Sequence, residues 1–106
     1  MKLVVTIVHP EDSDRLVKSL AQKGYGTTCI PSTGSFLGQE NRTLFTGVAD
    51  ERVKEVSSII RSAVHWRSVD NPGKTPDNSM VVDEDAQITV GGATIFVLDV
   101  DQFLRV

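Results

Sequence analysis

The sequence contains the same order of elements twice: an apolar strand-like run, an amphipathic helical stretch and a second strand-like run. "KLVVTIV" at 2–8 is short, apolar and rich in β-branched residues, which is typical of a buried strand. The following segment changes to a helical period, because Leu16, Leu20 and Ala21 share one face. The pattern predicts strands at 2–8, 27–33, 42–48 and 87–100, and helices at 12–23 and 49–64.

Two strand–helix–strand halves predict an α+β fold. The expected architecture is a ferredoxin-like split βαβ sandwich, with a four-stranded antiparallel sheet and both helices on one face. A chain of 106 residues is close to the commonest domain size, so we expect a single domain over 1–106.

Local signals predict where these elements begin and end. Asp12 or Ser13 is expected to cap the first helix, Gly24 to end it, and Asp50 to cap the second helix. Residues 66–85 carry two prolines and many charges, and are predicted to be a loop that is the most mobile part of the chain. The last segment is predicted to be a strand pair or one bent strand, with a bulge or tight turn at Gly91-Gly92.

Charge and composition exclude several partners and compartments. A net charge of -3 and a pI near 5.2 argue against a surface for long nucleic acid, although a small phosphate ligand stays compatible. One cysteine, Cys29, cannot form an intrachain disulfide, and no apolar run is long enough for a signal peptide or a membrane span. We therefore expect a cytoplasmic protein.

Two strands of the predicted sheet are apolar on both faces. "TLFTGV" and "ATIFVL" have this composition, while two helices can cover only one face of the sheet. The second face is therefore expected to be covered by a partner chain, which predicts a homo-oligomer.

The segment "STGSFLGQENRT" at 32–43 joins two predicted strands and contains an apolar pair, Phe36 and Leu37. An ordinary hairpin tip needs glycine and polar residues and has no use for such a pair. Two explanations stay open: the pair packs under its own loop or against a neighbouring chain, or it forms part of a binding site.

Several segments resemble the PII-like family of cyclic-di-AMP receptors, which are small trimeric signalling proteins with the ferredoxin-like fold. The most specific pieces are "STGSFL" in the hairpin and "VGGATIFVL" in the last strand, and the similarity extends over nearly the whole chain. In that family, neighbouring subunits hold the cyclic dinucleotide through the second strand, the loop after it and the third strand. The resemblance implies a homotrimer and a ligand site at Thr28, Phe36, Leu37, Asn41 and Gly47. We add Gly38, whose backbone is expected to approach the ligand, and Arg42 as a candidate cation.

The sequence departs from the family pattern at specific positions. Gly26 stands where members usually have an arginine, Ser35 replaces the second glycine of a Thr-Gly-Gly-Phe-Leu loop, and Glu40 adds an acidic group. A phosphodiester needs charge-assisted donors, so these changes are expected to weaken a dianionic ligand by about ten- to several hundred-fold. Arg42 is the candidate compensating cation, reached from the opposite side of the hairpin.

Other classes of function find less support. The acidic residues gather at helix starts and at 83–85, where capping and solvation explain them, so we expect no enzyme and no cofactor. His9 and His65 are isolated, without a second metal ligand at a suitable spacing, so no metal site is predicted. An RNA-binding sheet would alternate aromatic and basic residues on its central strands, which these strands lack.

The sequence therefore predicts a nucleotide-responsive signal-transduction protein of the PII-like type. A cyclic-di-AMP ligand is expected between subunits, where it orders the loops at 34–41 and 66–85 and changes the surface seen by an unknown downstream protein. The alternative is a structural or protein-binding relative that has lost cyclic di-AMP or binds another small ligand.

Overall fold

The computed structural model describes residues 1–34, 40–70 and 87–106. Phe36, Leu37 and Gly38, and most of the predicted loop at 66–85, lie outside these ranges. In chain order the elements are β1 (Lys2–Val8), α1 (Pro10–Gln22), β2 (Thr28–Thr33), β3 (Glu40–Val48), the 3₁₀ turn η1 (Asp50–Arg52), α2 (Val53–Ala63), β4 (Trp66–Asp70), β5 (Gln87–Gly91) and β6 (Ala93–Asp99).

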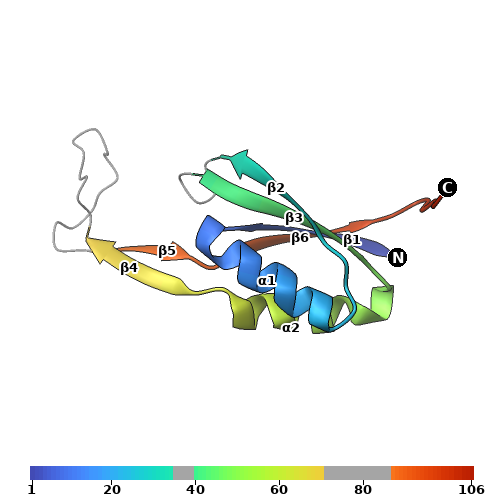
Figure 1. Ribbon diagram of the computed structural model, residues 1–106, viewed down its shortest axis with the longest axis horizontal. Helices are drawn as coiled ribbons and strands as arrows, with labels where there is room; N and C mark the ends of the chain where they lie inside the picture. The colour runs from blue at the N-terminus through green and yellow to red at the C-terminus, as the bar shows by residue number, and fades with distance from the viewer. Residues whose placement is uncertain (35–39, 71–86) are drawn as a thin grey trace.

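Four of the strands form one antiparallel sheet in the order β2-β3-β1-β6, as Figure 1 shows. β1 lies between β3 and β6, and its last residue, Val8, pairs with Arg42 on one side and Ala93 on the other. This order interleaves the two strand–helix–strand halves, since β3 lies between β1 and β2 and β1 lies between β3 and β6, and it confirms the ferredoxin-like fold.

Both helices pack on the same face of the sheet (Figure 1). Along β1 every second residue is buried, because side chains of a strand alternate between the two faces. The core is formed by Val4, Val8, Leu44 and Val48 from the sheet, Leu16 and Leu20 from α1, and Val56, Ile60 and Ala63 from α2, with Tyr25 at the edge.

The first helix begins earlier than the sequence predicted. Pro10 is its first residue and His9 is the N-cap, with its Nδ1 accepting the backbone N–H of Glu11 at 3.1 Å. Proline suits the first helical position because its fixed φ is helical and its missing N–H would have no partner there. The prediction of Asp12 or Ser13 as the cap was therefore wrong.

The end of α1 follows the prediction at Gly24. Gly24 has a φ of +90° and donates its N–H to the carbonyl of Ala21, while Tyr25 donates to the carbonyl of Leu20. These two bonds define a Schellman motif, in which the glycine takes the left-handed position that side chains disfavour. Tyr25 then packs into the core beside Leu20.

The second helix does not use Asp50 as a cap. Ala49 precedes the 3₁₀ turn and Arg52 precedes α2, and neither donates or accepts a side-chain capping bond. The Asp50 carboxylate instead pairs with the N-terminal ammonium of Met1 at 2.7 Å, and this interaction lowers the pKa of Asp50 from its ordinary value. The start of β1 and the 3₁₀ turn before α2 are thus joined electrostatically.

Part of the segment predicted as a loop is a strand. β4 pairs with β5 in an antiparallel two-stranded ladder, from Trp66 opposite Gly91 to Asp70 opposite Gln87. We call this ladder the β4–β5 arm; it extends beyond the four-stranded sheet in Figure 1. Of the two predictions for 87–100, the strand pair is wrong, because β5 pairs with β4 and β6 pairs with β1. The segment instead bends at Gly92, where φ is +72° and the chain passes from the arm to the sheet.

The face of the sheet opposite the helices carries apolar side chains. By register this face includes Val5, Phe45 and Phe96 at paired positions, and Phe96 and Leu98 are 40% and 48% exposed. This observation agrees with the expected apolar second face. Among the residues that the structure describes, no helix is both long and apolar enough to cross a membrane.

Candidate ligand-binding site

One end of the sheet brings together the two segments that the sequence analysis singled out. The β2–β3 hairpin leaves the sheet beyond the Arg42–Val8 pair, and the β4–β5 arm leaves it beyond the Ala93–Val8 pair. Both segments therefore emerge at the same end of the molecule, whereas the two termini lie at the other end (Figure 1).

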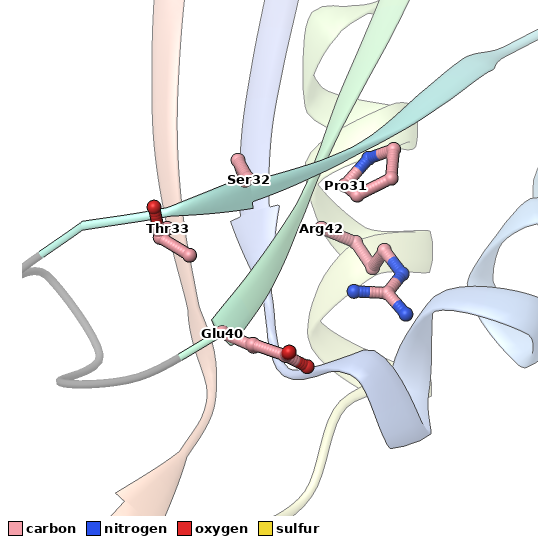
Figure 2. Close-up of a pocket in the computed structure, with 5 residues that line it drawn as sticks. All are labelled: Pro31, Ser32, Thr33, Glu40 and Arg42. Carbon is pink, nitrogen blue, oxygen red and sulfur yellow. The ribbon is translucent and has the colours of Figure 1, made fainter.

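A cavity of about 310 Å³ lies at the end of the β2–β3 hairpin where Thr33 pairs with Glu40. Figure 2 shows the side chains of Glu40 and Arg42 extending from β3 to the same side, with Pro31 above them on β2. Its lining residues are Pro31, Ser32, Thr33, Glu40 and Arg42. The volume is at the lower limit for small-molecule sites, which run from about 300 to 1,000 Å³.

Arg42 is the cation of this cavity. Its side chain is half-buried, and one guanidinium nitrogen, Nη1, donates to the carbonyl of Asn41 at 3.0 Å. None of the ion pairs found within residues 1–34, 40–70 and 87–106 includes Arg42. A guanidinium has five N–H donors, so this group keeps donors for an anion such as a phosphodiester.

The acidic group of the cavity opposes this role. The exposed Glu40 side chain projects to the same side as Arg42 in Figure 2. The two residues are two positions apart on β3, and side chains at this spacing in a strand lie on one face. An anion that enters the cavity therefore meets a carboxylate as well as a guanidinium.

Asn41 and Thr28 lie on the other face of the hairpin. Register places Thr28 opposite Phe45, and Asn41 opposite Ser32, all on the face that the helices leave open. Asn41 is 2% exposed, with its amide nitrogen close to Gly34, whereas Thr28 is exposed. On the same face the hydroxyls of Ser32 and Thr43 share a hydrogen bond of 2.8 Å.

Gly47 lies near Thr28 but away from Asn41 and Arg42 within one chain, because Thr28 pairs with Phe45, two residues before Gly47 on β3. It pairs with Leu3 in unbroken register, so it is not a bulge, and it lies toward the end of the sheet that holds Met1. A Cβ at this position would lie 3.0 Å from the terminal methyl of Met1, which is flexible enough to move. Within one chain, therefore, the structure places Asn41 and Arg42 at one end of the β2–β3 ladder, and Thr28 with Gly47 toward the other end.

Gly26, where an arginine was expected from the family pattern, has open space around it. No heavy atom lies within 4 Å of a Cβ built there. The next residue, Thr27, shares a 3.1 Å hydrogen bond between its hydroxyl and that of Thr46. A larger side chain at Gly26 thus fits without disturbing this contact.

Sequence reasoning missed Ser32, Thr33 and Pro31 as lining residues. They were included in the strand or the hairpin but were not assigned a role. The signal that could have identified Pro31 and Thr33 is their pairing with Arg42 and Glu40 on the partner strand, which puts them on the same face once the hairpin register is known. Ser32 pairs with Asn41 on the other face, so this signal does not identify it.

The two histidines have separate positions. His9 caps α1 through Nδ1, and His65 lies exposed between α2 and β4. Over the ranges that the structure describes, no group of three or more histidine, cysteine, aspartate or glutamate side chains is arranged to hold a metal ion.

Comparison with known proteins covers the whole chain. The family model described as "Cyclic-di-AMP receptor" matches residues 1–106. Among solved structures, the chain is similar to a functionally unknown protein from Pediococcus pentosaceus ATCC 25745, with 35% sequence identity and a TM-score of 0.74. That match covers 99% of this chain and 96% of the other.

Proposed function

The chain belongs to the cyclic-di-AMP receptor family, and on this premise we propose that it is a nucleotide-responsive signalling protein that binds cyclic di-AMP between the subunits of a homotrimer. The observation that carries the proposal is the half-buried Arg42 guanidinium, which borders a cavity at the end of the sheet where the hairpin and the arm emerge.

The size of the cavity supports a shared site. About 310 Å³ at the hairpin of one chain is small for a ligand with two nucleosides and two phosphodiesters. Thr28 and Asn41 lie on one face of the sheet and Arg42 on the other, so one chain cannot place all three around one ligand. A neighbouring subunit supplies the remaining wall.

The uncovered apolar face supports the homotrimer. Phe96, Leu98 and Ile30 are each at least 40% exposed on the face away from the helices. Burial of such side chains stabilises an assembly by about 25 cal/mol for each Å² of apolar surface removed from water. The number of subunits in this proposal, three, is taken from the resemblance to the PII-like family.

In the proposed mechanism the ligand orders the hairpin segment at 34–41 in one conformation. The state in which this segment is ordered binds the ligand more tightly, so ligand binding shifts the population toward it. A downstream protein then recognises the changed surface. The proposed ligand-binding residues remain Thr28, Phe36, Leu37, Gly38, Asn41, Arg42 and Gly47.

Calorimetric titration with cyclic di-AMP and linear adenine nucleotides tests the proposal. Phe36→Ala is expected to cost about 1 to 3 kcal/mol of binding free energy while leaving the trimer intact, because stacking of a base on an aromatic ring contributes that range. Gly26→Arg is expected to tighten cyclic di-AMP specifically, since the new guanidinium reaches open space near the hairpin and pairs with a phosphate.

The second candidate function is that of a structural or protein-binding relative that has lost the dinucleotide. The observation that favours it is Glu40, whose carboxylate extends on the same side as Arg42. This candidate is supported if neither the native chain nor Gly26→Arg binds cyclic di-AMP and Phe36→Ala instead breaks the trimer. In that case the hairpin serves to hold neighbouring subunits together and does not bind a ligand.

A further inference from the structure

The β4–β5 arm joins the body of the protein at two residues that contact each other. The carbonyl of His65 accepts the N–H of Gly92 at 3.1 Å, so the chain enters and leaves the arm at one place. Gly92 has a positive φ and His65 follows the end of α2, which means that neither strand continues straight from a helix or from the sheet. Any further contact made at this junction therefore bears on the direction of the arm.

Asp12 supplies that contact from the first turn of α1. Its side chain is fully buried, and its Oδ2 accepts the backbone N–H of His65 at 3.3 Å. Its Oδ1 accepts a hydrogen bond from Arg15 Nη2 at 2.7 Å. Arg15 in turn donates from Nε to the carbonyl of Ala63 at 3.0 Å, at the last residue of α2. One carboxylate therefore links α1, the end of α2 and the base of the arm.

The cost of burying this carboxylate indicates that it serves more than α1. Removing a carboxylate from water costs several kcal/mol even after the protein relaxes around it. Capping of α1 does not account for this burial, because the N-cap of the helix is His9. The Arg15 guanidinium also lies at the C-terminus of α2 rather than at that of its own helix, where a cation is favoured by the helix dipole.

We propose that Asp12 is a positioning residue that fixes the direction of the β4–β5 arm relative to the sheet, and that Arg15 holds the Asp12 carboxylate in place. The arm is thereby kept at the end of the sheet where the hairpin emerges, instead of turning about the contact between His65 and Gly92. This inference goes beyond the proposed function, because it concerns the protein without ligand.

Spin-label distance measurements on the ligand-free full chain test this directly. Labels at Lys18, which is exposed on α1, and at Thr89 on β5 report the direction of the arm, in a Cys29→Ser background diluted with unlabelled protein. We expect Asp12→Ala and Arg15→Gln each to broaden the distance distribution at least twofold. Asp12→Asn is expected to give a smaller effect, because its amide oxygen can still accept the N–H of His65.

The matched control is Arg52→Gln. Arg52 forms an ion pair with Glu55 at the same i,i+3 spacing as Arg15 with Asp12, but at the start of α2. We expect this variant to leave the distance distribution unchanged. Hydrogen exchange of β1 and β3 amides in each variant measures whether the body stays folded.

The outcomes separate positioning from general stability. Broadening in the Asp12 and Arg15 variants, with protection of β1 and β3 kept within twofold of the native chain, supports the proposal. An unchanged distribution in both variants overturns it, as does a loss of protection in the body that matches the broadening. If Asp12→Ala does not fold, Asp12→Asn and Arg15→Gln decide by the same criteria.

Discussion

Thr6 is a single buried polar residue whose hydroxyl lacks a hydrogen-bond partner. It lies on the helix-facing side of β1, paired with Leu44 and Ile95, and its Oγ1 is buried without a donor or acceptor nearby. Thr46 is equally buried, but its hydroxyl bonds to that of Thr27. The two threonines are therefore equally buried, but only the hydroxyl of Thr46 has a hydrogen-bond partner among the residues that the structure describes.

We expect Thr6→Val to raise the free energy of unfolding by roughly 1 kcal/mol, because a methyl group replaces a desolvated hydroxyl of similar size. Thr46→Val is expected to lower it by about the same amount, since it leaves the Thr27 hydroxyl without its partner. Urea denaturation of both variants measures this contrast. A loss of stability in Thr6→Val would show that its hydroxyl is satisfied in solution.

Another residue-level feature is the cluster of Tyr25, Arg52 and Glu55. The Tyr25 hydroxyl donates to the Glu55 carboxylate, and Arg52 donates to both of these groups at 3.0 and 3.1 Å. The hydrogen bond from Tyr25, followed by that from Arg52, lowers the pKa of Glu55 below its ordinary value of 4.5. The cluster joins the turn after α1 to the first turn of α2.

A carboxyl group with a lowered pKa in the folded state contributes stability above its unfolded pKa and loses it as pH falls through the folded value. The difference in unfolding free energy between the native chain and Tyr25→Phe is therefore expected to have its maximum value above about pH 4.5 and to decrease below it. Denaturation midpoints between pH 7 and pH 3 measure this. A difference that grows on acidification would contradict the assigned hydrogen bond.

Among the elements, the Schellman turn that ends α1 depends on one glycine. Gly24→Ala is expected to lower stability by about 1 to 2 kcal/mol, because the φ of +90° strains any residue with a Cβ, although the space around it is open. Gly26→Ala has the same open space and no positive φ, so it is expected to be neutral or slightly stabilising. Thermal unfolding of this pair isolates backbone strain from side-chain packing.

Most of the elements predicted from the sequence carry their own burial pattern, and β2 is the exception, because its residues are exposed or half-buried. β1, β3 and both helices alternate or repeat with a clear period, because one face of each packs on the core. β4 was missed, since a short strand in a two-stranded ladder owes its conformation to pairing with β5 and not to an apolar face. The caps were misassigned because His9 and Pro10 act together, whereas the sequence pattern favoured aspartate or serine.

The candidate site was predictable only as far as the hairpin. Adjacent residues on a strand point to opposite faces, so Asn41 and Arg42 had to separate, and the structure shows that Arg42 faces the cavity. The contribution of Ser32 and Thr33 depended on the register between β2 and β3, which the sequence does not specify. The proposed site between subunits would use contacts that the sequence of one chain does not place.

For the whole molecule, the apolar face of the sheet predicts the assembly. Phe96 and Val97 are adjacent on β6, similarly exposed, and point to opposite faces. We expect Phe96→Glu to convert the trimer to monomers in native mass spectrometry, because it places a charge in the apolar interface. Val97→Glu, on the helix side, is expected to leave the trimer intact. A native chain that stays monomeric at micromolar concentration would contradict the homotrimer.

The contact between His65 and Gly92 also bears on how the chain tolerates changes in length. The N–H of Gly92 and the carbonyl of His65 lie 3.1 Å apart, so the two ends of the arm are held together at the body of the protein. The segment between them is therefore a closed insertion, and the fold of the body does not depend on its length. The entropic cost of closing an inserted segment grows only with the logarithm of its length, by about 0.6 kcal/mol for each doubling. Replacing 67–90 by a short glycine–serine linker is therefore expected to preserve the melting temperature of the body within a few degrees. Insertions and deletions between His65 and Gly92 thus leave the register of the four-stranded sheet unchanged, whereas a single added residue inside β6 reverses the faces of every side chain beyond it.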